Sequence, residues 1–165
     1  MFFHKIIATG FGAGYSPIAP GTAGALVACA ILWGLHFVLP EKFSGGWQQV
    51  HWLLLLIVVF FLLGVNSAKA LEPAWGHDPS KIVVDEMVGT WIAMLGIPFS
   101  PVNLVAAFVL FRVFDIWKPL GIRRMEGLKR GWGVMMDDVV AGMYAGALLH
   151  LVLLLLSLRA TSNVY

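Results

Sequence analysis

Charged side chains are scarce in this sequence. Only 12% of its 165 residues are Asp, Glu, Lys or Arg, whereas 59% are hydrophobic, and the mean hydropathy is +0.85. A soluble domain usually has about 25% charged residues, so this composition predicts a membrane protein. The length suits a single domain over residues 1–165, and the net charge of +2 is too small to indicate a nucleic-acid partner.

Cysteine is almost absent as well. The single Cys29 excludes an internal disulfide and a cysteine-based zinc site. It lies inside the apolar stretch GALVACAIL, where we expect a buried side chain. The N-terminal stretch MFFHKIIATGFGAG has one lysine and no sustained apolar run. We therefore expect no cleaved signal peptide, with the first apolar segment retained in the protein.

Three long apolar runs are present, at residues 22–39, 50–68 and 139–158. Each is close to the roughly 20 residues that cross a hydrocarbon core about 30 Å thick. Two shorter runs, 82–97 and 102–117, contain charges and are separated by GIPFSP, whose glycine and prolines indicate a tight turn. We expect these two to form an antiparallel hairpin. The sequence therefore predicts an all-α integral membrane bundle of about four to five helices.

The basic residues are distributed unevenly over the predicted loops. If the first two runs cross the membrane and the hairpin returns to its own side, most of them lie on the side of the N-terminus. That side has Lys5, Lys69, Lys81, Lys118, Arg123, Arg124, Lys129 and Arg130, and the other has Lys42 and Arg159. The positive-inside rule makes the richer side the cytoplasm. We therefore expect a multi-pass protein with its polar site at the cytoplasmic face.

Most acidic residues fall at that same predicted end. The five beside apolar segments are Asp85, Glu86, Asp115, Asp137 and Asp138. Lys81–Asp85 and Arg112–Asp115 have the spacing of ordinary helix-surface ion pairs, and acids near a helix N-terminus favour its dipole. Taken together, however, charges at a membrane boundary are costly and usually mark function. Five carboxylates without neighbouring histidine or cysteine form an oxygen ligand set of the kind that Mg²⁺ prefers. We expect all five to bind metal and to act in catalysis.

Magnesium sites of this kind often bind a substrate phosphate too. Lys118, three residues after Asp115, is the basic residue best placed to contact it, and we expect it to act in catalysis. The stretch TGFGAGYSPIAPGTAGAL leads into a predicted helix N-terminus, which suits an anion, although taken alone it fits a flexible, closely packed lead-in better. The candidate phosphate-binding residues are Gly12, Ser16, Thr22, Arg112, Lys118 and Arg123.

Asp137 and Asp138 are adjacent, so on a regular helix they point about 100° apart. The GWG just upstream allows the helix to start late. We therefore expect Asp138 to cap or position the helix start and Asp137 to be the metal ligand of the two, unless a bent first turn presents both carboxylates to the metal.

Four blocks of the sequence, taken in their order along the chain, resemble the conserved blocks of one protein family: ATGFGAGYSPIAPGTAGAL, HDPSKIVVDEMVGTWIA, FRVFDIWKPLGI and GWGVMMDDVVAGMYAG. Together they resemble the phosphatidylglycerophosphatase A family and cover most of the chain. The resemblance implies a phosphatase of the bacterial cytoplasmic (inner) membrane that converts phosphatidylglycerophosphate to phosphatidylglycerol with Mg²⁺. It also implies functional roles for the acids of DE, FD and DD and for Lys118 in KP. Gly121 and Glu126 depart from the family pattern, so Glu126 is left out of the candidate site.

Alternatives remain open at the level of mechanism and function. The attack could come from a water molecule that a carboxylate positions, or from an aspartate itself. The Asp-x-Asp-x-Thr pattern of aspartyl phosphatases is absent, and no histidine follows a Ser-Gly pair. A phosphatidyltransferase using a CDP-activated lipid and a small cation carrier are the alternative functions, although the sequence has neither the long aspartate pattern of the first nor the internal repeats frequent in the second. The expected partners are a phospholipid substrate and membrane lipids.

Overall fold

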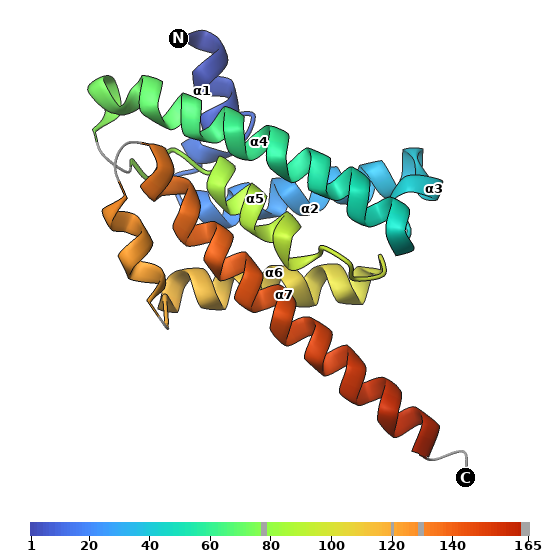
Figure 1. Cartoon of the computed structure of the whole chain (residues 1–165). Helices are drawn as coiled ribbons and strands as arrows, with labels where there is room; N and C mark the ends of the chain where they lie inside the picture. Colours follow the sequence, from blue (N-terminus) through green and yellow to red (C-terminus); the bar gives the residue numbers. More distant parts are fainter. Residues whose placement is uncertain (77–78, 120, 129–130, 163–165) are drawn as a thin grey trace.

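The computed structural model describes residues 1–76, 79–119, 121–128 and 131–162. Within these ranges the protein is all-helical, as the sequence predicts (Figure 1). The longer helices are α2 (Pro20–Val38), α4 (Gly46–Trp75), α6 (Pro101–Trp117) and α7 (Gly131–Ser162). The shorter ones are α1 (Phe2–Ala8), η1 (Ala13–Tyr15), α3 (Pro40–Phe43), α5 (Val84–Ala93) and η2 (Ile122–Gly127).

Three of the described helices, α2, α4 and α7, are long and apolar enough to cross a membrane. This confirms the three predicted spans, but not their limits. With 30 and 32 residues, α4 and α7 are about 45–48 Å long at 1.5 Å per residue. α4 continues past the apolar run to Trp75, and α7 begins before it, at Gly131. Both helices therefore extend beyond the thickness of a hydrocarbon core.

The predicted hairpin is formed by α5 and α6. The turn between them packs on the connection between α2 and α4, where Phe99 N donates to Ser44 O (3.2 Å), and on the first turn of α4, where Gln49 Nε2 donates to Ile97 O (2.8 Å). The ring of Phe99 also stacks on His36, with 4.0 Å between centroids. The hairpin therefore reaches the end of the bundle where α2 is connected to α4.

Successive long elements consequently alternate in direction (Figure 1). The starts of α2, α5 and α7 and the end of α6 share the opposite end of the bundle, which we call the site end. In the view of Figure 1, α7 continues past the other helices toward the C-terminus.

The short helix α5 lies at the centre of the bundle, since eight of its ten residues are buried. It crosses α7 very closely. A Cβ added to Gly142 would meet the carbonyl oxygen of Gly89, and a Cβ added to Gly89 would lie 2.8 Å from the carbonyl oxygen of Asp138. Small residues allow this approach, as is common between helices in membranes. The glycine crossing thus fixes the distance between the acids of α5 and those of α7.

The N-terminal segment holds the start of α2 against the start of α5. Val83 N donates to the carbonyl oxygen of Ala8 (2.8 Å), and Gly14 packs on the carbonyl of Lys81 so closely that a Cβ would clash. Further along, Gly24 of α2 packs on Val83. The glycine-rich lead-in therefore serves close packing, and it places the first turn of α2 at the site end.

Candidate active site

The five predicted acids come from three helix ends that meet at the site end. Asp85 and Glu86 lie in the first turn of α5, and Asp115 lies in the last turn of α6. Asp137 and Asp138 are the seventh and eighth residues of α7, counted from Gly131. All except Glu86 are buried, and Glu86 is partly buried. The sequence predicts that these acids share one end of the bundle, because two spans cross the membrane and the hairpin returns to its own side. The structure places them together at that end.

Three of these carboxylates form one compact group. Asp85, Glu86 and Asp138 each offer an oxygen, and the three oxygens lie within 4.8 Å of one another. Asp85 and Asp138 are only 7% and 3% exposed. The second carboxylate oxygen of Glu86, Oε2, is buried and has no hydrogen-bond partner among the described residues. A buried carboxylate oxygen without a donor is poorly solvated when charged, so the group is either protonated or stabilised by a nearby positive charge.

The other two acids are each held by a cation. Arg112 Nη1 donates to Asp115 Oδ2 at 2.5 Å and lies 4.0 Å from Glu86 Oε1. Lys118 Nζ donates to Asp137 Oδ2 at 2.7 Å. All of these side chains are largely shielded from solvent. The site end therefore contains a group of three acids flanked by one arginine and one lysine.

Lys118 reaches α7 because of the way α6 ends. It is the C-cap of α6 and has a left-handed backbone, with φ 49° and ψ 52°. Its N–H donates to the carbonyl oxygen of Phe114 (2.8 Å), and Pro119 follows, which cannot continue the helix. A left-handed conformation costs about 1 kcal/mol or more for a residue other than glycine. This strained turn sets the lysine beside Asp137.

The first turn of α2 faces the same group. Its N-terminus has Pro20 at the first position and no side-chain cap. A Cβ added to Gly21 would collide with Glu86 Oε1 and lie 3.1 Å from Arg112 Nη1. The first backbone N–H groups of a helix lack intrahelical acceptors and carry a partial positive charge. The start of α2 thus presents anion-binding groups next to the acids and Arg112.

Burial and neighbouring charge change the acidity of the α5 carboxyls. Burial, and next the charge of Glu86, raise the pKa of Asp85 well above its ordinary value. Burial also raises the pKa of Glu86. A cation bound among these oxygens would oppose both shifts, because it favours the charged form. The chemistry of the group therefore fits a hard cation.

The predicted phosphate-binding residues separate into two sets. Arg112 and Lys118 contact the acids directly, and Thr22 lies in the first turn of α2. No described hydrogen bond or ion pair joins Gly12, Ser16 or Arg123 to the acids. The described contacts of those three residues are with groups other than the acids.

Gly12 donates its N–H to Thr9 Oγ1 (3.1 Å) and lines a separate hollow of about 320 Å³. Ser16 Oγ donates to the carbonyl oxygen of Ile18 (2.9 Å), and Arg123 is exposed on η2. Their roles in phosphate binding therefore stay predictions. Lys129 and Arg130, counted in the charge distribution, lie outside the described residues, as does the side chain of Glu126.

One expectation about the acids is wrong, and one ion pair that the spacing allowed is not formed. Asp138 does not cap α7, because the helix begins at Gly131 and GWG forms its first turn. Among the described residues, the three-acid group includes Asp138 and not Asp137, and metal binding by Asp137 stays a prediction. Lys81 is not an ion-pair partner of Asp85 either. It precedes α5, and its Nζ lies over the ring of Trp75, 6.0 Å from the centroid.

One residue that shapes the site was missed. Gly21 leaves the space that the Glu86 carboxylate occupies. The Pro-Gly pair at the start of α2 was a visible signal for it.

These features define a helical membrane protein with buried carboxylates, two cations and a helix N-terminus at one end, an arrangement suited to phosphate chemistry. The family model for phosphatidylglycerophosphatase A matches residues 6–153. The chain therefore belongs to the phosphatidylglycerophosphatase A family, and it is a phosphatase.

Two curated relatives carry the name of this family, and a third is named for a different lipid. A protein of Escherichia coli (strain K12) named phosphatidylglycerophosphatase A is 37% identical, over 89% of this chain and 81% of its own. One of the same name from Haemophilus influenzae is 39% identical, over 85% and 82%. A protein of Bacteroides thetaiotaomicron named "Putative phosphatidylinositol-3-phosphatase" is 51% identical, over 87% and 89%. No solved structure matches the chain.

Proposed function

We propose that this protein hydrolyses the terminal phosphate monoester of phosphatidylglycerophosphate, with Mg²⁺, to give phosphatidylglycerol and phosphate. The observation that carries the proposal is the three-acid group flanked by Arg112 and Lys118 at the site end. Family membership supports the substrate, because two relatives carry that activity in their names. The proposal places the site at the cytoplasmic face of a bacterial inner membrane.

The donor set supports magnesium rather than a softer metal. Asp85, Glu86 and Asp138 provide only carboxylate oxygens, which Mg²⁺ prefers and zinc or copper sites rarely use alone. These three residues would hold the ion, and the unpartnered Glu86 Oε2 fits such a role. When bound, magnesium polarises phosphoryl oxygens and lowers the pKa of a coordinated water.

The basic residues would bind the substrate phosphate. Arg112 and Lys118 neutralise its negative oxygens, and the free N–H groups of the first turn of α2 can donate to it. Asp115 and Asp137 hold these two cations in place through the 2.5 Å and 2.7 Å hydrogen bonds. Because the cations are already oriented, little side-chain entropy is lost when the phosphate arrives.

The chemical step breaks one P–O ester bond. An oxygen nucleophile attacks phosphorus, the glycerol oxygen of the lipid leaves, and that oxygen takes up a proton to become the alcohol. If water attacks, a carboxylate of the group accepts its proton. If an aspartate attacks, a phospho-aspartate forms and water hydrolyses it afterwards. Acid quenching during turnover of ³²P-labelled substrate separates the two routes, since only the second labels the protein.

A second substrate is favoured by a specific observation. The Bacteroides relative is 51% identical and is named "Putative phosphatidylinositol-3-phosphatase". Both lipids present a phosphate monoester on a polyol head group, so the same acids and cations could act on either. The part of the substrate that differs lies beyond the phosphate.

Phosphate release from purified protein in detergent tests the proposal. We expect release from phosphatidylglycerophosphate that requires Mg²⁺, is abolished by EDTA and is poorly supported by Ca²⁺, which favours more ligands and a looser geometry. Parallel assays with phosphatidylinositol-3-phosphate give the ratio of kcat/KM. A higher kcat/KM for the inositol lipid would show that it is the preferred substrate in place of phosphatidylglycerophosphate. Full activity in EDTA would show that the reaction needs no metal ion.

A further inference from the structure

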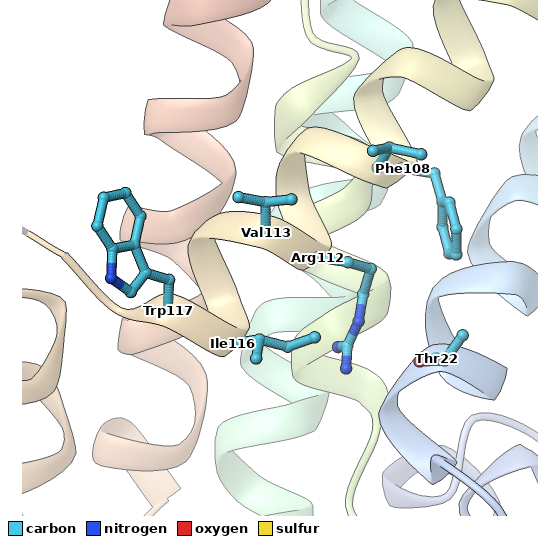
Figure 2. A pocket seen from close by; sticks show the side chains of 7 residues that line it. Thr22, Phe108, Arg112, Val113, Ile116 and Trp117 are labelled. Atoms are coloured by element: carbon cyan, nitrogen blue, oxygen red, sulfur yellow. The ribbon is translucent and has the colours of Figure 1, made fainter.

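An apolar groove lies on the side of the bundle between α2 and α6 (Figure 2). Its volume is about 470 Å³, which is within the roughly 300–1,000 Å³ range of small-ligand sites. The lining residues are Thr22, Phe108, Val109, Arg112, Val113, Ile116 and Trp117. All but Thr22 and Arg112 are apolar, and several are well exposed on the outer face of the bundle.

The groove differs from a bare helix surface because it leads to the site. In Figure 2, Arg112 projects from α6 into the space between Ile116 and Thr22. The same guanidinium bonds Asp115 and approaches Glu86, so one side chain is shared by the groove and the acids. Thr22, on the opposite wall, belongs to the uncapped first turn of α2.

We infer that this groove binds one acyl chain of the phospholipid substrate, with the polar head directed past Arg112 to the acids. The inference rests on the proposed function and adds the part of the lipid that the site recognises beyond its phosphate. Charge complementarity supports this occupant. Five of the seven lining residues are apolar. Arg112 adds a guanidinium, and the first turn of α2 beside it adds helix N–H groups, of the kind that an anionic head group requires.

A second groove provides an internal comparison. It has about 310 Å³ and is lined by Leu35, Leu39, Phe43, Trp52, Leu55, Leu56 and Val59. None of these residues is charged or belongs to the site. A groove of that kind fits bulk lipid chains, whereas the α2–α6 groove combines apolar residues with a guanidinium that also contacts the acids.

The expected effect follows from the membrane environment. A chain that moves from the bilayer into the groove gains little hydrophobic free energy, because lipid tails are as apolar as the groove wall. Its binding would instead set the position of the head group relative to Arg112 and the acids. Filling the groove should therefore weaken productive binding of long-chain substrate, while a short-chain substrate, which occupies little of the groove, should be affected much less.

The test uses Val113→Trp and Val109→Trp, which place large rings in the groove at positions about half exposed. Val105→Trp is the matched control: it has the same residue type on the same helix, but it lies outside the groove. Each full-length variant is assayed at fixed detergent concentration with dioleoyl and dihexanoyl forms of the lipid phosphate that the wild type hydrolyses. We expect KM for the dioleoyl substrate to rise about tenfold in each groove variant, with a much smaller rise for the dihexanoyl substrate and none in the control.

Three other outcomes would contradict the acyl-chain assignment or the proposed function. Equal shifts for both chain lengths, or no shift, would overturn the acyl-chain assignment and leave the groove to bulk lipid. A change in oligomeric mass by light scattering, specific to the groove variants, would assign the groove to a second copy of the chain and would also overturn it. If the wild type released no phosphate from either chain length, the proposed function itself would be wrong.

Discussion

At the scale of single residues, the five acids of the site are not equivalent. Asp138 belongs to the three-acid group with Asp85 and Glu86, whereas Asp137 accepts a hydrogen bond from Lys118. Adjacent positions on a regular helix point about 100° apart, so each faces a different partner. This division gives Asp138 the environment of a metal ligand and Asp137 that of a residue that positions a cation.

Replacing these two aspartates by asparagine separates their roles. We expect Asp138→Asn to lower kcat by about 10²-fold or more and to raise the magnesium concentration needed for half-maximal activity. Asp137→Asn should mainly raise KM, by about 10–100-fold as for lost supporting groups, because Lys118 loses its charged partner. Magnesium titrations at several substrate concentrations measure both effects. Identical magnesium shifts in the two variants would contradict the division.

Gly21 is the second residue-scale prediction. In Gly21→Ala the new methyl group meets Glu86 Oε1, the movable end of a flexible side chain, and crowds Arg112 Nη1. These side chains can move at a low cost in stability, but the Glu86 carboxylate must then leave its position. We therefore expect turnover to fall about tenfold or more while thermal stability in detergent changes by less than about 1 kcal/mol. Wild-type turnover in this variant would show that the position of Glu86 does not matter.

At the scale of helices, hydropathy was a good guide to number and a poor guide to length. It identified α2, α4 and α7 as spans, because about 20 apolar residues are needed to cross the membrane. It missed the polar ends of α4 and α7, since a helix continues wherever its backbone bonds are satisfied, in water as well as in lipid. The late start expected for α7 had a different source, the glycines of GWG. These residues instead form the first turn of the helix, so the capping role expected for Asp138 was wrong.

The pairing of the acids was beyond sequence reasoning for a related reason. Sequence position placed all five at one end, as observed. Which of them meet depends on how far each helix rotates and on the left-handed turn at Lys118. It also depends on the close α5–α7 approach at Gly89 and Gly142. Those features come from packing between segments distant in the chain, which a single sequence does not display.

The glycine crossing gives a prediction at this scale. In Gly142→Ala the methyl group would meet the backbone carbonyl of Gly89, which cannot move without shifting α5. We expect destabilisation of about 1–3 kcal/mol, seen as a lower unfolding temperature in detergent, with loss of activity. Gly34→Ala is the matched control, because its Cβ would enter open space in α2 and alanine favours helix. Equal stability of both variants would show that α5 and α7 can move apart at the glycine crossing without loss of stability.

At the scale of the whole molecule, the alternating helices assign each loop to one end of the bundle. Ser44 lies at the end where the hairpin turn packs, and Ser80 precedes α5 at the site end. Both residues are exposed. The basic residues of the site end include Lys5, Lys81 and Lys118, whereas Lys42 lies beside Ser44. If the positive-inside rule holds, Ser80 faces the cytoplasm and Ser44 faces the other side of the membrane.

Cysteine labelling tests this orientation. Cys29, which is partly buried in α2, is first replaced by serine, and Ser44→Cys and Ser80→Cys are introduced separately. We expect a membrane-impermeant maleimide to label Cys at position 44 in intact spheroplasts and at position 80 only after the membrane is opened. Phosphate release by both variants confirms that the labelled protein is folded. Labelling of both positions from the same side would refute the alternating topology, and the reverse pattern would place the site on the outer face.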